Sequence, residues 1–360
     1  MKKWILRAAA LLIAAVMLAV PCGAQFGTDE LYGAVPEEVR DVLDDSGISP
    51  TGGSESVSLT DILGYIAELV TENIGKPLKM FASVLAVVLL SALLSGISGA
   101  AAGKVYTLVT SAASAVIISL YLGDIIGTAR TAFSAASDFM LVYVPVIAGV
   151  TAVGGHQASA ALFSTLTLTA IQILARLTSA VIIPLTSCII GITAAGSVDP
   201  ELNLDRLSEG IKKFVVWGLG LIMTLFLGIL SVQSIITASA DNAAMKTLKF
   251  AVSSAVPIVG GAVSEAMSTV SGSISLLKSG IGGFGIAAGA CLLAPQVIAV
   301  LCCKFALFAA GVVSDLFGSS ETGKMIRSGE NAMTVILAAL SCFFVFITVS
   351  SAILLAFCRS

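Results

Sequence analysis

Residues 214–240 read FVVWGLGLIMTLFLGILSVQSIITASA, a stretch without a charged side chain that ends at Asp241. About 20 consecutive apolar residues are enough for a helix to cross the hydrocarbon layer of a membrane. A helix suits that environment because all of its backbone hydrogen bonds are made within the segment. The stretch therefore predicts a transmembrane helix.

The whole chain of 360 residues shares this character. It is 57% hydrophobic and only 11% charged, with a mean hydropathy of +1.02, whereas soluble domains are about 25% charged. Glycine is abundant, with 34 residues, and small residues allow membrane helices to approach closely. A membrane β-barrel would instead need short segments of alternating hydrophobicity. We expect an all-α, polytopic integral membrane protein.

Charge-free runs predict seven or eight transmembrane helices after a cleaved signal peptide. One long run contains Gly154-Gly155-His156-Gln157, which is typical of a hairpin tip, so we expect two helices there. Residues 305–318 either extend the preceding helix or form a short element of their own. The runs are 80–103, 105–123, 139–175, 177–198, 214–240, 279–303 and 331–358.

Three segments precede this multispan domain, which covers residues 80–360. Residues 1–24 have a basic start, a short apolar stretch and a small residue before a cleavage point, which predicts a signal peptide and an extracytoplasmic mature N-terminus. Residues 25–57 are acidic and rich in turn residues, so we expect a flexible extracytoplasmic segment. Residues 58–79 predict an amphipathic helix at the outer membrane surface.

The segment 250–285 is only half apolar and contains glycines, serines and one charge of each sign. Small and polar residues recur in it at four-residue spacing, which puts them on one helix face for close packing or for lining water. We predict a pore-lining or packing element. Its candidate residues are Pro257, Gly260, Gly261, Ser264, Glu265, Ser268, Gly272 and Lys278.

No motif predicts catalysis, so we expect no enzyme, no catalytic residue, no cofactor and no metal. His156 is the only histidine and is expected at a solvent-exposed turn. Gly280, Gly282 and Gly285 spell GxGxxG, but this fingerprint binds dinucleotides only between a strand and a helix. We interpret the glycines as a hinge between membrane elements. No basic footprint predicts a nucleic-acid partner.

Charges near the ends of the runs are predicted to lie at the membrane interface. They are Asp124, Arg130, Asp138, Arg176, Asp241, Lys304 and Asp315. Arg176 separates two apolar runs and therefore marks either a helix break or an internal ion pair, because a charge within the membrane is costly unless it is paired or functional.

Two segments carry a resemblance to a known family. They are LDRLSEGIKKFVVWGLGLIMTLFLGILSVQS at 204–234 and AAMKTLKFAVSSAVPIVGGAVSEAMSTVSGSISLLKSGIGGFG at 243–285. Their most specific elements are Lys-Phe at 249–250, Pro-Ile-Val-Gly-Gly at 257–261 and Leu-Leu-Lys at 276–278. With these segments the chain resembles the stage III sporulation protein AE family.

The resemblance implies a multi-pass component of the channel that endospore-forming bacteria assemble between mother cell and forespore. It implies a place in the mother-cell membrane around the forespore and a role in late forespore gene expression. The implied partners are other proteins of the same operon, namely an ATPase, small membrane proteins and ring-forming proteins. No residue role is carried over from the family.

Two alternatives to a permease-like channel subunit remain open from the sequence. A self-contained secondary transporter would bind a solute near the membrane midplane through Glu265, Lys278 or Arg176. A scaffold would anchor partners through the acidic segment 25–79, which has eleven acidic and three basic residues.

Overall fold

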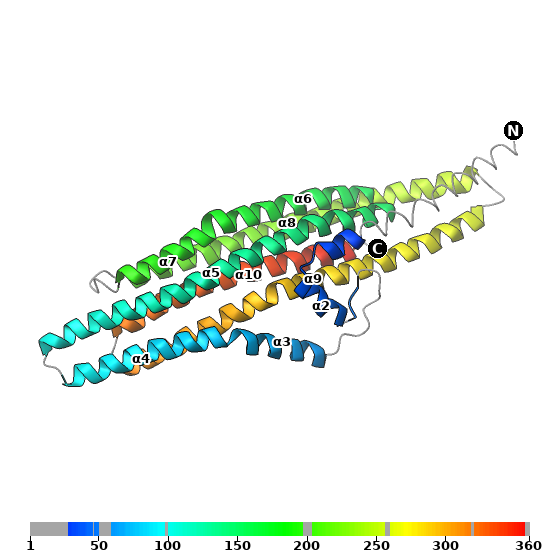
Figure 1. Cartoon of the computed structure of the whole chain (residues 1–360). Helices are drawn as coiled ribbons and strands as arrows, with labels where there is room; N and C mark the ends of the chain where they lie inside the picture. Colours follow the sequence, from blue (N-terminus) through cyan, green and yellow to red (C-terminus); the bar gives the residue numbers. More distant parts are fainter. Residues whose placement is uncertain are drawn as a thin grey trace.

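Helix is the only regular structure in the residues that the computed structural model describes, which are 28–45, 47–49, 59–97, 100–196, 204–255, 260–317 and 320–356. The helices lie side by side in an elongated bundle (Figure 1). After a short helix at 28–33, they are α2 (Glu37–Asp45), α3 (Leu59–Asn73), α4 (Gly75–Ile97), α5 (Ala100–Val153), α6 (Gln157–Leu177), a π-helical turn (Thr178–Ile182), α7 (Ile183–Gly196), α8 (Leu204–Ala255), α9 (Gly260–Leu316) and α10 (Ser320–Ala356).

Within this described part, five helical stretches are long and apolar enough to cross a membrane. The pair α3 and α4, bent by 42°, brings the number to six if it is one broken span. The all-helical membrane architecture is therefore as expected, whereas the number differs from seven or eight. The signal peptide lies outside the described residues.

The predicted runs and the observed helices differ at two boundaries, of which one is absent and the other is a local irregularity. The runs 105–123 and 139–153 belong to one helix, α5, which has 54 residues. Its charged residues between the two runs occupy only the outer side, while Phe133, Ala136 and Phe139 keep the inner side buried. Since the inward pattern stays apolar at helical spacing, the charges do not end the helix.

A second predicted boundary, at Arg176, is a local irregularity. The π-helical turn begins at Thr178, two residues after Arg176, and α7 continues from Ile183. Pro184 follows directly and cannot donate a backbone hydrogen bond, a defect that a wider turn accommodates. The predicted break is thus present as a bulge. Arg176 itself is exposed, and no described residue pairs with it. The internal ion pair is not seen.

The hairpin tip at 154–157 is confirmed. Gly155 has φ +91°, a conformation that favours glycine, and α6 begins at Gln157. α5 and α6 therefore run antiparallel along the bundle.

Part of the acidic N-terminal segment packs on the bundle. In residues 28–45, the side chains of Leu31, Val35 and Leu43 are buried, and the ring of Tyr32 stacks on Phe284 of α9 at 6.0 Å. These apolar residues anchor the segment to the bundle although it is acidic overall. The predicted amphipathic helix at 58–79 corresponds to α3 and the first turn of α4, where Pro77 is tolerated.

α10 lies at the centre of the bundle. In its apolar stretch 56% of the residues are buried, against 22% in that of α8. Phe343 packs against Phe133 of α5 at 5.0 Å between ring centroids, and Phe346 packs against Phe226 of α8 at 4.5 Å. Aromatic pairs at these distances contribute about 0.5–1.5 kcal/mol beyond the burial of their area. These two contacts fix the positions of α5, α8 and α10 relative to one another along the bundle axis.

Close approach of α5 and α9 depends on Gly285. A β-carbon at this position would overlap Cε2, Cζ and Oη of Tyr143. Tyr143 is itself fully buried and donates a hydrogen bond of 2.9 Å to Ser351 of α10. Gly285, which belongs to the rejected dinucleotide motif, is thus required for helix packing. It lies within the continuous helix α9, so the hinge expected from the sequence is not present at this position.

Candidate functional site

A cluster of ionisable side chains lies where the α5–α6 turn meets α8 and α9. Asp241 of α8 and Lys278 of α9 are each only 3% exposed. His156, at the turn, places its Nδ1 3.8 Å from Oδ2 of Asp241. Buried charges are rare in membrane proteins and mark functional or structural sites, so these three residues form the candidate site.

Asp241 holds the beginning of α6. Its two carboxylate oxygens accept hydrogen bonds from the backbone N–H groups of Ala158, at 3.0 Å, and Ser159, at 3.1 Å. The first N–H groups of a helix have no partner within the helix, and a carboxylate also interacts favourably with the helix dipole. His156 makes no such capping bond with its side chain. Asp241 therefore acts as the cap, supplied from another helix.

His156 is not at a free, exposed tip. Its side chain is 22% exposed, and partial burial together with the charge of Lys278 lowers its pKa from the ordinary 6.5, although Asp241 acts in the opposite direction. The turn itself is packed, because a β-carbon at Gly154 would lie 3.2 Å from Cγ2 of Ile274 on α9. Burial and the charge of Lys278 therefore disfavour protonation of His156.

Lys278 is the one predicted site residue that reaches this cluster. No described residue forms a hydrogen bond or ion pair with its ammonium group, yet the group is buried close to His156 and Asp241. Lys278 and Asp241 bring side chains of opposite charge to the cluster. Protonation of His156 would add an uncompensated positive charge.

Among the other predicted site residues, none whose side chain the structure describes reaches the cluster. Gly260, Gly261, Ser264, Glu265 and Ser268 lie in the first part of α9, which projects together with the end of α8 beyond the rest of the bundle (Figure 1). Gly272 is exposed, and Pro257 lies outside the described residues.

Glu265 and Lys278 do not meet. Both lie in the same unbroken helix, α9, and a helix rises 1.5 Å per residue, so about 20 Å separates them along its axis. At this separation along one helix the two residues do not form an ion pair within one chain.

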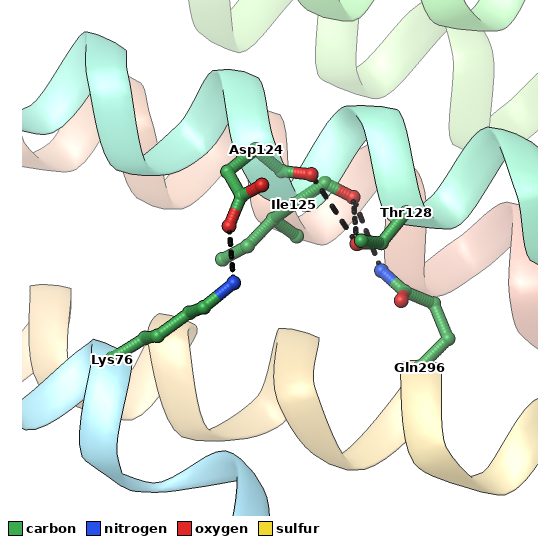
Figure 2. A network of polar contacts seen from close by, with 5 residues as sticks. All are labelled: Lys76, Asp124, Ile125, Thr128 and Gln296. Carbon is green, nitrogen blue, oxygen red and sulfur yellow. Dashed lines mark hydrogen bonds and ion pairs between the residues drawn. The ribbon is translucent and has the colours of Figure 1, made fainter.

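A second polar network joins α4, α5 and α9 midway along α5 (Figure 2). Nζ of Lys76 lies 2.7 Å from Oδ2 of Asp124. The carbonyl oxygen of Ile125 accepts hydrogen bonds from Oγ1 of Thr128, at 3.1 Å, and from Nε2 of Gln296, at 3.1 Å. Gln296 is only 7% exposed, so its amide ties α9 to the backbone of α5, whereas the ion pair lies on the surface.

A third network joins α8 to α10. Lys212 donates to Oδ1 of Asn331 at 2.7 Å, Asn331 donates to Oγ of Ser208 at 3.1 Å, and Ser208 donates to Oγ of Ser328 at 3.1 Å. Ser208 and Ser328 are buried. Hydrogen bonds of this kind hold membrane helices together where the hydrophobic effect between helices is absent.

Sequence reasoning expected Asp241 at the membrane interface and His156 at an exposed turn, and so missed the contact between them. Asp241 ends the apolar run 214–240, which signalled only the end of a span. Its partners are backbone groups of another hairpin, 82 and 83 residues away in the sequence. Among the described residues, no group of three His, Cys, Asp or Glu side chains is placed to hold a metal ion.

Comparison with known proteins gives one consistent match. The family model described as stage III sporulation protein AE matches residues 46–358. The protein named Stage III sporulation protein AE of Bacillus subtilis (strain 168) is 25% identical over 216 residues, which are 60% of this chain and 54% of that protein. The alignment thus spans about half of that relative. No solved structure matches the chain.

Proposed function

The chain belongs to the stage III sporulation protein AE family, which gives it a role in sporulation, and from this we propose that it is a permease-like, non-enzymatic membrane subunit of the channel between mother cell and forespore. The observation that carries the proposal is the combination of this family with five apolar helices long enough to cross a membrane. In this role the protein supports late gene expression in the forespore.

The proposal includes a definite placement. Residues 1–24 direct the chain to the membrane and are removed, the mature N-terminus lies outside the cytoplasm, and the bundle sits in the mother-cell membrane around the forespore. The proposed partners are an ATPase, small membrane proteins and ring-forming proteins of the same operon.

Purification after crosslinking in sporulating cells tests this proposal. A tagged copy is crosslinked in the cells, extracted in mild detergent, and the proteins that accompany it are identified by mass spectrometry. We expect the ATPase and the ring-forming proteins of the operon, and their absence from a control that carries the tag on an unrelated multi-pass protein. Recovery of the chain alone, while the partners remain assembled with one another, would contradict the proposal.

One observation favours a second candidate, a self-contained secondary transporter. Lys278 and Asp241 are buried charges from different helices, an arrangement that transporters use to couple solute and proton movement. Purified protein in liposomes distinguishes the two functions. Solute-dependent proton flux that is lost in the Lys278→Met variant would support the transporter, and absence of flux would support the channel subunit.

A further inference from the structure

The middle of α5 presents an outer surface unlike the rest of the helix. From residue 121 to residue 140, every exposed residue is charged, hydroxylated or glycine, whereas the flanking exposed residues Leu120 and Leu141 are apolar. With 3.6 residues per turn these positions fall on one side of the helix. We call them the polar face of α5: Gly123, Asp124, Gly127, Thr128, Arg130, Thr131, Ser134 and Asp138.

The opposite side of the bundle is apolar at the same level. Phe133 of α5 packs on Phe343 and Phe226 of α8 packs on Phe346, and these two residues of α10 lie within one helical turn. Near Phe226, Leu225 is 57% exposed and Ile229 is 54% exposed. At one level along the bundle axis, α8 therefore has an apolar surface suited to contact with lipid, and α5 has a polar surface.

The polar face is poorly suited to contact with hydrocarbon. Arg130 is exposed, and within the described residues it forms no hydrogen bond or ion pair. The ion pair of Asp124 with Lys76 leaves the two side chains 52% and 71% exposed. A charged group at membrane depth is tolerated only where it faces water or a partner of opposite charge.

The position of the polar face in the bundle indicates which surface of the chain is suited to contact with water. α3 and α4 lie along one side of the bundle and α6 and α8 along the other (Figure 1). The ion pair between Lys76 and Asp124 bridges α4 and α5 (Figure 2), and both of its side chains are more than half exposed. The interior at the same level is filled by the rings of Phe133, Phe343 and Phe346.

We propose that the polar face of α5 lines a water-filled passage that lies between this chain and neighbouring subunits, and not inside one copy. The proposal rests on the channel function proposed above and adds which surface the passage uses. Mixed charges on the face, with Asp124 and Asp138 alternating with Arg130, suit contact with water and small polar solutes. α8 faces lipid on the far side.

Reactivity of introduced cysteines tests the proposal. Thr131→Cys and Ser134→Cys probe the polar face, and Leu225→Cys and Ile229→Cys probe α8 at the same level. The full chain, assembled in membrane fragments that are open on both sides, is treated with a small charged thiosulfonate. Labelling is read on the peptide of each new cysteine, so that the native cysteines do not interfere. After denaturation in SDS all four must react.

We expect the two cysteines of α5 to react at least about tenfold faster than those of α8, since the thiolate is the form that attacks the thiosulfonate and releases sulfinate, and a thiol in hydrocarbon remains protonated. Equal, fast reaction on both helices would place this level outside the hydrocarbon and overturn the proposal. Slow reaction on both would do the same, because the face would then be dry.

A larger reagent tests enclosure by other subunits. A maleimide attached to a long polymer is expected to label Thr131→Cys in the isolated chain but not in the complex from sporulating cells. Equal labelling in both would show an open surface and refute the passage. The labelling results are independent of whether the chain is needed for sporulation. If the polar face reacts but deletion of the chain leaves sporulation unchanged, the proposed function is refuted and the assignment of the surface stands.

Discussion

Replacement of Gly285 by alanine tests the packing on which the bundle depends. A single methyl group at this position overlaps the ring of Tyr143. That ring has little freedom to move, because it is fully buried, stacks on Phe139 at 5.4 Å and donates its hydroxyl to Ser351. The strain must therefore be taken up by a separation of α5 and α9.

The expected loss follows from two opposing effects. Overpacking of a well-packed interior costs about 1–3 kcal/mol, and alanine in place of glycine within a helix recovers about 0.5–1 kcal/mol. We expect Gly285→Ala to lower the free energy of unfolding by about 1–2 kcal/mol. Gly283→Ala is the matched control, since a β-carbon there has no atom within 4 Å, and it should raise stability by about 0.5–1 kcal/mol.

Unfolding of the purified protein in mixed micelles, followed by circular dichroism, measures both variants. A double-mutant cycle with Tyr143→Leu separates the contact from general effects, because the smaller side chain removes the overlap and should make Gly285→Ala nearly harmless. Equal stability of the Gly285→Ala and Gly283→Ala variants would refute the proposed close contact between α5 and α9.

Three further predictions concern the polar clusters. Asp241→Ala should lower the free energy of unfolding by about 1–3 kcal/mol because two N–H groups of α6 lose their acceptor, and Asp241→Asn should cost less; equal effects of the two would contradict the capping role. The pKa of His156 is lower in the folded protein than its ordinary 6.5, so the unfolded chain binds more protons as the pH falls through 6.5. The protein should therefore lose stability over this range, and His156→Gln should lose less; identical pH profiles in urea or SDS titrations would argue against the burial of His156. Asn331→Leu should destabilise the bundle by about 1–3 kcal/mol, because Ser208 and Lys212 lose this partner. Asp124→Asn, at an exposed ion pair, should change stability by less than about 1 kcal/mol. A larger effect of Asp124→Asn than of Asn331→Leu in the same unfolding assay would refute the view that the buried network contributes more than the surface ion pair.

The extent to which the sequence predicted the fold varies with the kind of signal. Apolar runs and the Gly154-Gly155 turn are local features, and they predicted the all-helical membrane architecture and the hairpin correctly. The continuity of α5 through Asp124, Arg130 and Asp138 was missed because charge was taken as a boundary, whereas only the burial of the opposite side decides whether a helix continues.

The candidate site was predictable only in part, for a related reason. Lys278 was noticed because a lone charge in an apolar segment is conspicuous in any sequence. Its neighbours Asp241 and His156 come from helices that meet it only in the folded bundle. Residues Leu31, Val35 and Leu43 show the same limit, since an acidic composition concealed the few apolar side chains that pack the N-terminal segment on α9.

Late gene expression in the forespore tests the central claim most directly. A reporter for such a gene is measured in a strain whose only copy of the chain is deleted and then restored. We predict loss of the reporter signal on deletion, recovery with the unsubstituted chain or with Gly283→Ala, and little recovery with the bulkier Gly285→Leu, whose side chain separates α5 from α9. An unchanged signal in the deletion strain would contradict a role as a subunit of the channel between mother cell and forespore.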